Sequence, residues 1–599
     1  MLDIQTLRKT QVQVIALGSY PAIMQSMLDF DYVSGKKEPS IRAIIAAGRN
    51  YERYFWGKRE VLIPVFPSVS DVPKKIREEA NFFINLSSGR RTFSSTEEAL
   101  TTLPSLIGGI VFAENVPEQH AIALYAQAQK KKIFLTGPAS IGIILPSVMK
   151  LGAIGGVDVR QLTTAHLFTP GSVAVLSSSG GMTNEIINTV THYGKRISFS
   201  LSFGGERFPM TTPEMAFLAA EKDPQTKTIV YFGELGGTDE ALLADLLKAK
   251  KITKKVICYI AGTVAEMFVT PPQFGHAKAM ASKQEESARG KRIMLRQSGA
   301  QVADSYAEFL SQIQAIPEDF VPEGLAYTFD IDSLINRQRA LITTSISGVK
   351  NGQPQLLGED LLTIVKQESF ATLVMSMFLG KKIHSKELEN FTDFVLRLLA
   401  DHGPYVSGAM NTIVTARAGR DLVSSLSAGL LTIGPRFGGA INQAAANWLT
   451  GVSSEKDPAN FVEEFASKRQ YISGIGHKKY RSDAPDPRVK EIEQFAKSLT
   501  HKRFTHFALS VEKITTAKKG NLILNVDGAI AAVLLDLLSE KEGVSDRELK
   551  RLVASEFFNA LFVLSRSVGF ISHFLDQKRL DEGIFRLPEN LVSEAEIQS

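Results

Sequence analysis

Cysteine is nearly absent from this sequence, since Cys258 is the only one among 599 residues. A single cysteine excludes an intrachain disulfide and a cysteine-based zinc site, and it favours a reducing compartment. Long hydrophobic runs are missing as well: we find no stretch of about 18 apolar residues, and Asp3 and Gln5 stand where a signal peptide needs an apolar core. We therefore expect a soluble, cytoplasmic protein with no membrane partner.

The sequence also has little excess charge of either sign. Its 68 lysines and arginines against 63 aspartates and glutamates give a net charge of +5, which does not require a nucleic-acid partner. Short basic clusters such as 130–132 are either solvated surface or, as the rarer alternative, a binding site for a phosphorylated or polycarboxylate ligand. No Gly-Gly loop ends in the Lys-Ser/Thr of a Walker A motif, so a self-sufficient ATP site is not expected. No set of metal ligands is predicted either.

What the sequence does contain is enough chain for roughly four domains of about 150 residues. Up to residue 320, short apolar runs alternate with helical stretches and end in small or glycine-rich loops. The predicted strands cover residues 12–17, 61–66, 82–85, 133–135, 173–176, 228–232 and 256–260. Buried strands of this kind, each followed by a turn and a helix, indicate parallel α/β sheets, which bind ligands at the carboxyl ends of their strands.

Regular structure breaks at Pro317 and Pro322, and a turn is predicted at 351–354. Beyond it the pattern is helical. Apolar residues with the spacing of one buried helix face occur at Phe391, Phe394, Val395, Leu398 and Leu399. Asp486 and Pro487 have the order of an N-cap and a first helical residue. We expect α/β domains over 1–155 and 156–318 and an all-α domain over 319–599.

A candidate phosphate loop, Ser-Ser-Ser-Gly-Gly at 177–181, directly follows the predicted strand 173–176. Small residues leave backbone N–H groups free to face an anion, and the following helix adds its positive end. Ser179, Gly180 and Gly181 are the candidate ligands. Serine and glycine are also ordinary helix-entry residues, so the loop alone leaves both interpretations open.

His276 is the candidate nucleophile of the first half. Its neighbours Gly275 and Ala277 leave it sterically open, and neutral imidazole is nucleophilic near physiological pH. Glu234 lies just after the predicted strand 228–232, where a carboxylate could hold the other ring nitrogen and fix the tautomer. A lone histidine is nevertheless more often structural.

The second half offers His402, His477 and Asp527, the two histidines beside glycines and the aspartate before an apolar helix. The accompanying arginines are Arg488, Arg566 and Arg586. Arginine forks bind carboxylates while histidine and aspartate move protons, so the set suits a polycarboxylate. Spacing alone favours the plainer interpretation of helix-surface arginines and a helix-capping aspartate.

The segments 137–140, 179–182, 233–237 and 274–277, in this order, resemble the α subunit of succinyl-CoA synthetase. With Met-Leu-Asp-Phe-Asp-Tyr at 27–32, the chain resembles ATP-citrate lyase still more closely. The resemblance implies a Rossmann-like CoA-binding domain and a flavodoxin-like domain in which His276 is transiently phosphorylated and oriented by Glu234. It also implies that the Gly180-Gly181 helix start stabilises the phosphate.

Two further residues of the first half acquire roles from this resemblance. Glu114 matches a family glutamate near the phosphohistidine and the citryl intermediate, and Arg90 is assigned to CoA. Ser178 departs from the pattern, because relatives commonly carry arginine there.

In the second half, the segments 401–403, 474–477, 485–488, 525–527 and 565–566 resemble the active site of citrate synthase, and 416–434 resembles ATP-citrate lyase. This implies His402 and the arginines at substrate carboxylates, His477 at the tertiary hydroxyl, where it helps remove the proton, and Asp527 at the acetyl methyl carbon. Lys518 and Lys519 match a basic segment near CoA. Phe437 replaces the histidine that stabilises the enolate in citrate synthases, which argues against an ordinary citrate synthase.

The resemblance as a whole implies the larger, α-type subunit of a two-chain enzyme that forms acetyl-CoA and oxaloacetate from ATP, citrate and CoA. The intermediates would be phosphohistidine, citryl phosphate and citryl-CoA. ATP and Mg²⁺ would be bound mainly by a separate β-type ATP-grasp subunit in an α4β4 complex that tetramerises through the helical domain, with Arg586 reaching a neighbouring site. Two alternatives stay open: a citryl-CoA or succinyl-CoA ligase subunit with a non-cleaving helical domain, and a non-catalytic CoA-binding scaffold.

Overall fold

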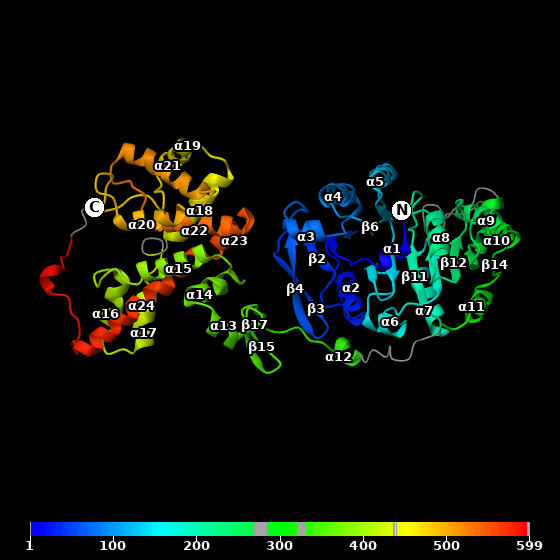
Figure 1. Cartoon of the computed structure of the whole chain (residues 1–599), viewed down its shortest axis with the longest axis horizontal. Coiled ribbons are helices and arrows are strands. Elements are labelled where there is room, and N and C mark those ends of the chain that lie inside the picture. Colours follow the sequence, from blue (N-terminus) through cyan, green and yellow to red (C-terminus); the bar gives the residue numbers. More distant parts are fainter. Residues whose placement is uncertain (1, 269–283, 320–329, 435–437, 439, 596–599) are drawn as a thin grey trace. The chain divides into compact units, whose positions relative to one another are not determined.

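The computed structural model describes residues 2–268, 284–319, 330–434, 438 and 440–595 (Figure 1). Contacts divide the chain into two compact units, Met1–Leu341 and Ile342–Ser599. The first contains two seven-stranded sheets, and the second is largely helical with a small three-stranded sheet. This confirms the predicted order of α/β and then helical structure, whereas the bounds of the three predicted domains stay a prediction.

The first sheet has the strand order β3-β4-β2-β1-β5-β6-β7. Its strands are β1 (Val14–Leu17), β2 (Ile41–Ile45), β3 (Tyr51–Trp56), β4 (Arg59–Phe66), β5 (Phe82–Asn85), β6 (Gly108–Val111) and β7 (Phe134–Thr136). All pair in parallel except β3, which pairs antiparallel with β4 at the edge. The six parallel strands follow the Rossmann order, in which the ligand crevice opens between β1 and β5.

The second sheet has the order β14-β13-β12-β10-β11-β8-β9. Its strands are β8 (Gly142–Leu145), β9 (Met149–Gly152), β10 (Val173–Ser177), β11 (Ile197–Ser202), β12 (Thr228–Glu234), β13 (Lys255–Ala261) and β14 (Gln301–Val302). Five parallel strands have the flavodoxin-like order, with the crevice between β10 and β12. The antiparallel strands β8 and β9 extend this sheet, although they lie within the residues 1–155 that the sequence assigns to the first domain.

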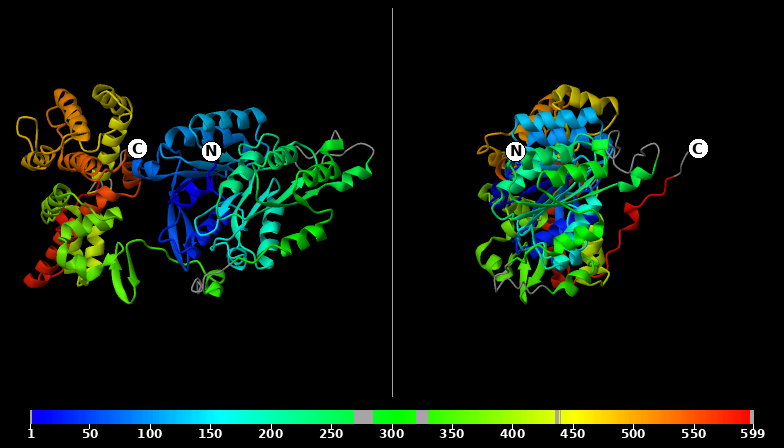
Figure 2. Two further views of the ribbon diagram at one scale, coloured as in Figure 1. Left: turned by 45° about the vertical axis from the view of Figure 1, so that its right-hand side comes forward. Right: turned by 90° about the vertical axis from the view of Figure 1, so that its right-hand side faces the viewer.

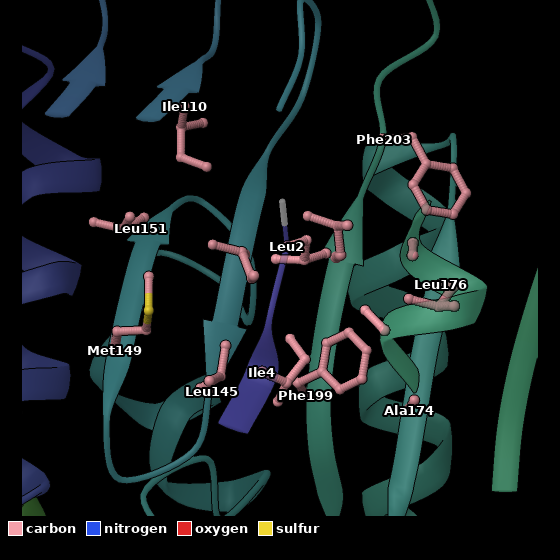
Figure 3. Close-up of a cluster of buried hydrophobic side chains, with 14 of the residues drawn as sticks. Leu2, Ile4, Ile110, Leu145, Met149, Leu151, Ala174, Leu176, Phe199 and Phe203 are labelled. Atoms are coloured by element: carbon pink, nitrogen blue, oxygen red, sulfur yellow. The ribbon is translucent and has the colours of Figure 1, made fainter. Parts of the chain in front are cut away.

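Helices cover both faces of these sheets (Figure 2). The helices of the first unit are α1 (Ile4–Arg8), α2 (Pro21–Val33), α3 (Lys74–Glu79), α4 (Gly89–Thr102), α5 (Glu118–Lys130), α6 (Val159–Thr164), α7 (Gly180–His192), α8 (Pro213–Lys222), α9 (Asp239–Lys248), α10 (Ala288–Gln297), α11 (Tyr306–Gln314) and α12 (Ile331–Ile335). One buried apolar cluster joins Ile110 of the first sheet to Met149 and Phe199 of the second, with Leu2 between them (Figure 3). Because each such side chain contributes about 1.5–3 kcal/mol on burial, the shared core makes one unit of both sheets.

The second unit is built around the buried helix α22. Its helices are α13 (Leu361–Gln367), α14 (Phe370–Leu379), α15 (Lys386–Leu398), α16 (Ser407–Arg417), α17 (Leu422–Leu430), α18 (Ala440–Ser453), α19 (Pro458–Ser467), α20 (Pro487–Ala496), α21 (Arg503–Lys518), α22 (Val526–Lys541), α23 (Asp546–Ala554) and α24 (Phe557–Leu580). Two predictions are confirmed here: α15 buries Phe391 and Val395, and α20 begins at Pro487 with Asp486 as its N-cap.

The second half is largely helical, as predicted, but it begins with a small sheet that the sequence analysis did not predict. A three-stranded sheet consists of β15 (Ser347–Lys350), β16 (Gln353–Leu356) and β17 (Glu359–Asp360). Asn351 and Gly352 join the first two strands with φ angles of 52° and 75°. Two successive positive φ angles define the type I′ turn that matches the twist of a hairpin. The sequence predicted the turn but not the hairpin.

Helix α24 has the length and composition needed to cross a membrane. It packs against α15, α16, α17 and α18 of the second unit, and it buries Phe558, Leu561 and Phe570 there. The core helix of a folded domain passes the same test of length and composition, so the finding is weak evidence for a membrane span.

Candidate active sites in the two units

The first candidate site lies at the carboxyl edge of the second sheet, where β10 and β12 end side by side. The Ser178 hydroxyl donates to the Glu234 carboxylate, with Oγ 3.2 Å from Oε1. The serine-glycine loop and the glutamate, predicted separately from two strand ends, therefore meet at the crevice where flavodoxin-like sheets bind ligands.

The helix start at 179–181 has the features of an anion site. Ser179 caps α7 by accepting the N–H of Met182 over 3.4 Å. A Cβ at Gly180 would lie 2.5 Å from Ile141 Cγ2, so the close packing there requires glycine. At Gly181 the corresponding position has no described atom within 4 Å, apart from its own helix and its chain neighbours. The open helix N-terminus suits a phosphate, and this role stays a prediction.

His276 lies outside the described residues. The described chain on either side of 269–283 reaches the Glu234 loop, because Ala261 of β13 pairs with Glu234 and the Glu286 carbonyl accepts the N–H of Gly236 over 2.9 Å. The loop of the predicted orienting carboxylate thus lies beside both ends of that segment.

Glu114 and Arg90 occupy neighbouring loops at the carboxyl edge of the first sheet. Glu114 is exposed and follows β6, and the next N–H, of Asn115, donates to Glu206 Oε1 over 2.9 Å. A Cβ at Gly89 would lie 2.8 Å from the Glu114 carbonyl, so α4 begins against this turn. Arg90 is exposed in the first turn of α4. Among the described residues, no hydrogen bond joins Glu114 to Ser178 or Glu234.

The second candidate site is a cavity of about 250 Å³ in the helical unit. It brings together five predicted residues from five separate segments: His402, His477, Arg488, Asp527 and Arg566. Its other lining residues are Leu399, Gly438, Asn525, Val526 and Phe562. Two guanidinium, two imidazole and one carboxyl group in one cavity can hold a carboxylate ligand and move protons on it.

Asn525 connects the His477 loop to the Asp527 helix, a role that the sequence analysis missed. Its Oδ1 accepts the N–H of Gly528 over 3.0 Å as the N-cap of α22, and its Nδ2 donates to the Gly476 carbonyl over 3.1 Å. A Cβ at Gly528 would lie 2.4 Å from the Gly474 carbonyl, so the two backbones touch only because glycine stands there. An asparagine before an apolar helix is the sequence signal for the cap, but not for the bridge.

The ring of His477 is held in one tautomer. Its Nδ1 accepts the backbone N–H groups of Lys479 and Tyr480 over 3.0 and 3.1 Å. Burial lowers the pKa of His477, with Arg488 and Lys479 acting in the same direction and Asp486 opposing them. A neutral ring whose Nδ1 accepts carries its proton on Nε2. The Nε2–H group of His477 is therefore available as a hydrogen-bond donor, whereas the role expected from the sequence needs a ring that accepts a proton.

Asp527 and Arg488 have different electrostatic surroundings. Burial raises the pKa of Asp527 to about 6, outweighing the opposite effect of Arg488 and Arg566. Arg488 binds Asp486 through Nε at 3.0 Å and Nη2 at 2.7 Å, which raises its own pKa. The cavity thus holds one carboxyl group that can be protonated near neutral pH and one arginine fixed in place by a buried aspartate.

The Arg566 guanidinium is buried in the cavity and leaves some of its donors unused within the described part of the chain. Its side chain is 4% exposed and lies over the Phe562 ring, 4.8 Å from the centroid. Among the described residues, its Nε and Nη1 have no hydrogen-bond partner. A buried guanidinium with unused donors is costly unless an anion binds it. Burial and the two arginines also lower the pKa of His402, so that ring is neutral and able to accept a proton.

Three predicted residues are not part of this cavity. Arg586 is exposed in the chain after α24, and Lys518 and Lys519 are exposed at the end of α21. The Lys518 Nζ atom lies 3.6 Å from Glu463 Oε2. The segment that follows these lysines runs beside the His477 loop, where the His477 N–H donates to the Asn521 carbonyl over 3.0 Å.

Asp527→Asn should raise stability in a pH-dependent way. The folded-state pKa of about 6 exceeds the ordinary 3.8, so the wild-type protein loses stability as pH rises from about 4 to about 6 and stays at the lower level above it. Asparagine does not ionise. The gain of the variant in free energy of unfolding should therefore grow across this window to about 3 kcal/mol and then stay constant. The thermal unfolding temperatures of the two proteins, measured across this pH range, should diverge accordingly. A difference that is independent of pH would contradict the buried carboxylate.

Comparisons with known proteins agree with the division of the chain into an α/β unit and a helical unit. Residues 333–587 match the family model described as citrate synthase, C-terminal domain, and residues 176–301 match the model described as CoA-ligase. Fold and sites together define a CoA-linked enzyme subunit with a ligase-type α/β unit and a citrate-synthase-type helical unit.

The chain is 36% identical over 607 residues to the probable ATP-citrate synthase subunit 1 of Neurospora crassa, covering 98% of this chain and 90% of that one. It is also 36% identical to human ATP-citrate synthase, but spans only 55% of that longer chain. The solved structure of ATP citrate lyase from Methanothrix soehngenii in complex with citrate and coenzyme A matches with a TM-score of 0.51 and 34% identity, covering 98% of both chains. The chain therefore belongs to the ATP-citrate synthase family, also called ATP-citrate lyase, as a chain of the subunit 1 type.

Proposed function

We propose that this chain carries two successive reactions, the formation of citryl-CoA in the α/β unit and its cleavage to acetyl-CoA and oxaloacetate in the helical unit. The observation that carries the proposal is the buried, unsatisfied guanidinium of Arg566 in a cavity shared with Asp527 and His477. The unused donors of Arg566 suit a carboxylate of the substrate. The Asp527 carboxyl group and the His477 imidazole supply the proton chemistry of cleavage.

In the first reaction, the γ-phosphoryl group of ATP passes to His276 and then to citrate. Glu234 orients the histidine, and the α7 start at Ser179, Gly180 and Gly181 stabilises the phosphate through its N–H groups and dipole. CoA then displaces phosphate from citryl phosphate, giving citryl-CoA. Glu114 acts near this intermediate, and Arg90 binds CoA.

In the second reaction, the carbon–carbon bond of citryl-CoA breaks. Arg488 and Arg566 hold the carboxylates, and His477 donates from Nε2 to the hydroxyl oxygen that becomes the carbonyl. His402, neutral in the cavity, accepts the hydroxyl proton. The bond electrons pass to the acetyl enolate, which takes the proton of Asp527, while Lys518 and Lys519 bind CoA.

ATP and Mg²⁺ are bound mainly by a second, ATP-grasp subunit. The support is the subunit 1 name of the Neurospora relative and the additional length of the human chain, together with the missing Walker A motif. We also propose that copies of this chain associate through the helical unit, in a cytoplasmic α4β4 complex. Large apolar side chains are exposed on α17 and α24 and just after α17, namely Val423, Leu431, Val568 and Leu575.

A ligase subunit that does not cleave citryl-CoA is the second candidate. It is favoured by Phe437, which stands where citrate synthases have an enolate-stabilising histidine. Phe437 lies outside the described residues. The two candidates differ in their product, because a ligase stops at citryl-CoA.

Mixing the chain with its ATP-grasp partner, ATP, Mg²⁺, citrate and CoA separates these functions. We expect oxaloacetate and acetyl-CoA in amounts equal to the ADP released. Citryl-CoA that accumulates without oxaloacetate would support the ligase subunit. A chain that carries no phosphohistidine would support the remaining alternative, a non-catalytic CoA-binding scaffold.

Arg566→Met should weaken cleavage of supplied citryl-CoA without destabilising the helical unit. Methionine fills similar volume but has no donors, so kcat/KM is expected to fall by roughly 10²-fold to 10³-fold. Among the described residues Nε and Nη1 of Arg566 have no hydrogen-bond partner, so removing this buried charge is neutral or favourable for folding. Arg579→Met is the matched control, because Arg579 is exposed on the same helix and pairs with Asp576. Equal kcat/KM in the two variants would contradict the role of Arg566.

A further inference from the structure

Two adjacent basic residues of α10, Lys291 and Arg292, are buried under the carboxyl edge of the second sheet. Their exposed fractions are 2% and 6%. Lysine and arginine are almost never buried unless they are paired, so each must have partners that account for its position. Neither residue belongs to the predicted machinery of either reaction.

The Lys291 ammonium uses all three of its protons. It donates to the Glu234 carbonyl over 2.9 Å, to the Gly236 carbonyl, and to Glu240 Oε2 over 2.5 Å. An ammonium group has three donors and no acceptor, so none of its donors is left. Two of the three bonds go to the backbone of the loop that carries Glu234.

Glu240, which holds Lys291 in place, is itself fixed from β12. The Tyr231 hydroxyl donates to Glu240 Oε1 over 2.7 Å, and burial, with the Glu240 charge, raises the pKa of Tyr231 far above its usual value. A Cβ at Gly233 would lie 2.3 Å from Glu240 Oε1, so glycine makes room for the carboxylate. Lys291 is therefore anchored at a fixed point below the loop.

Arg292 makes the equivalent contacts on the next strand. Its Nε and Nη2 donate to the Ile260 carbonyl of β13 over 3.0 and 2.5 Å, and its Nη1 donates to the Asp304 carbonyl over 2.9 Å. Its guanidinium lies over the Tyr259 ring, 4.7 Å from the centroid. One turn of α10 thus binds the ends of both β12 and β13.

We propose that Lys291 is a positioning residue for phosphoryl transfer. By fixing the backbone at Glu234 and Gly236, it holds the Glu234 carboxylate at the edge where the Ser178 hydroxyl meets it. The inference rests on the proposed function, in which Glu234 orients His276. In that step a nitrogen–phosphorus bond forms on the histidine while the bond from the γ-phosphorus to the bridging oxygen breaks, and ADP leaves with the electron pair. Lys291 touches none of these atoms.

The test is single-turnover labelling of the full chain, in complex with its ATP-grasp partner, with γ-labelled ATP. Lys291→Met removes the ammonium, and Lys291→Met with Glu240→Gln also removes the carboxylate that would be left unpaired. In both variants the rate constant for histidine labelling should fall between about 10-fold and 10²-fold. The ATP concentration for half-maximal rate should not change, because the nucleotide binds to the partner.

The matched control is Lys254→Met. Lys254 also donates to two backbone carbonyls, those of Ala220 and Asp223 at 2.8 and 2.5 Å, but at the amino end of β13. This variant should keep the wild-type rate constant. A merely structural role of Lys291 would lower the labelled fraction rather than the rate constant, and the double variant would restore it.

A wild-type rate constant in either Lys291 variant would overturn the positioning role. Absence of a histidine label in the unsubstituted complex would instead overturn the proposed function, and this inference with it.

Discussion

Asp527→Asn is expected to stop cleavage while citryl-CoA continues to form. The rate of oxaloacetate release should fall by about 10³-fold, since general acid–base catalysis by one group contributes typically 10²–10⁴-fold. The physical reason is that the Asp527 carboxyl, with a pKa of about 6, can carry the proton that the acetyl enolate needs, whereas an amide cannot supply it. Citryl-CoA should accumulate in proportion to the ATP consumed, as measured by mass spectrometry of quenched reactions.

The substitution should leave the fold of the helical unit intact. Asn525, and not Asp527, caps α22, and the variant is expected to be more stable than the wild-type chain above pH 6. Asp457→Asn serves as the control, because Asp457 caps α19 outside the cavity and asparagine caps a helix equally well. Oxaloacetate release at the control rate by Asp527→Asn would contradict the role of this carboxyl group.

His276→Ala is expected to abolish the reaction that depends on ATP. Alanine has no nitrogen to accept the phosphoryl group, so neither citryl phosphate nor citryl-CoA can form by this route. Release of oxaloacetate from ATP, citrate and CoA should drop below detection, and no acid-labile phosphate should remain on the chain. His192→Ala is the control, because His192 lies at the far end of α7. Retained turnover by His276→Ala would place the phosphoryl acceptor elsewhere.

The sequence predicted strands well where they are continuously apolar. The predicted strand 82–85 coincides with β5, and 228–232 falls inside β12. It missed β6, which contains Gly108 and Gly109, because glycine is depleted in strands. In the structure, the rings of Phe134 and Phe83 from the neighbouring strands cover these glycines. A Cβ at Gly108 would lie 2.2 Å from the Phe134 ring, and a Cβ at Gly109 would lie 2.2 Å from the Phe83 ring. The compensating residues lie far away in the sequence.

Strand β11 was missed for a different reason. Its sequence alternates serine with apolar residues, as a half-exposed strand would, yet all six residues are buried. Ser200 donates to the Val175 carbonyl over 2.8 Å, and Ser198 shares a hydrogen bond of 2.7 Å with Thr226. Burial of these hydroxyls depends on partners in other segments of the chain, which the local pattern does not reveal.

The helical site was predicted as a set of residues but not as a mechanism. Five of the eight predicted residues line one cavity, and the other three, Arg586, Lys518 and Lys519, lie apart from it. The tautomer of His477 depends on two backbone N–H groups in the turn that follows it, so residue types could not define it. The loop-fixing role of Lys291 depends likewise on backbone carbonyls, to which residue type gives no clue.

The central claim is that the two units carry separate reactions, and supplying citryl-CoA to His276→Ala tests it most directly. The quantity to measure is the rate of oxaloacetate release in the absence of ATP, beside that of the unsubstituted chain. We predict equal rates, because the described residues that line the cavity around Arg566 and Asp527 all belong to the helical unit, whereas the proposed role of His276 is confined to phosphoryl transfer. Loss of this cleavage to the same extent as the ATP-dependent reaction would contradict the division of labour between the units.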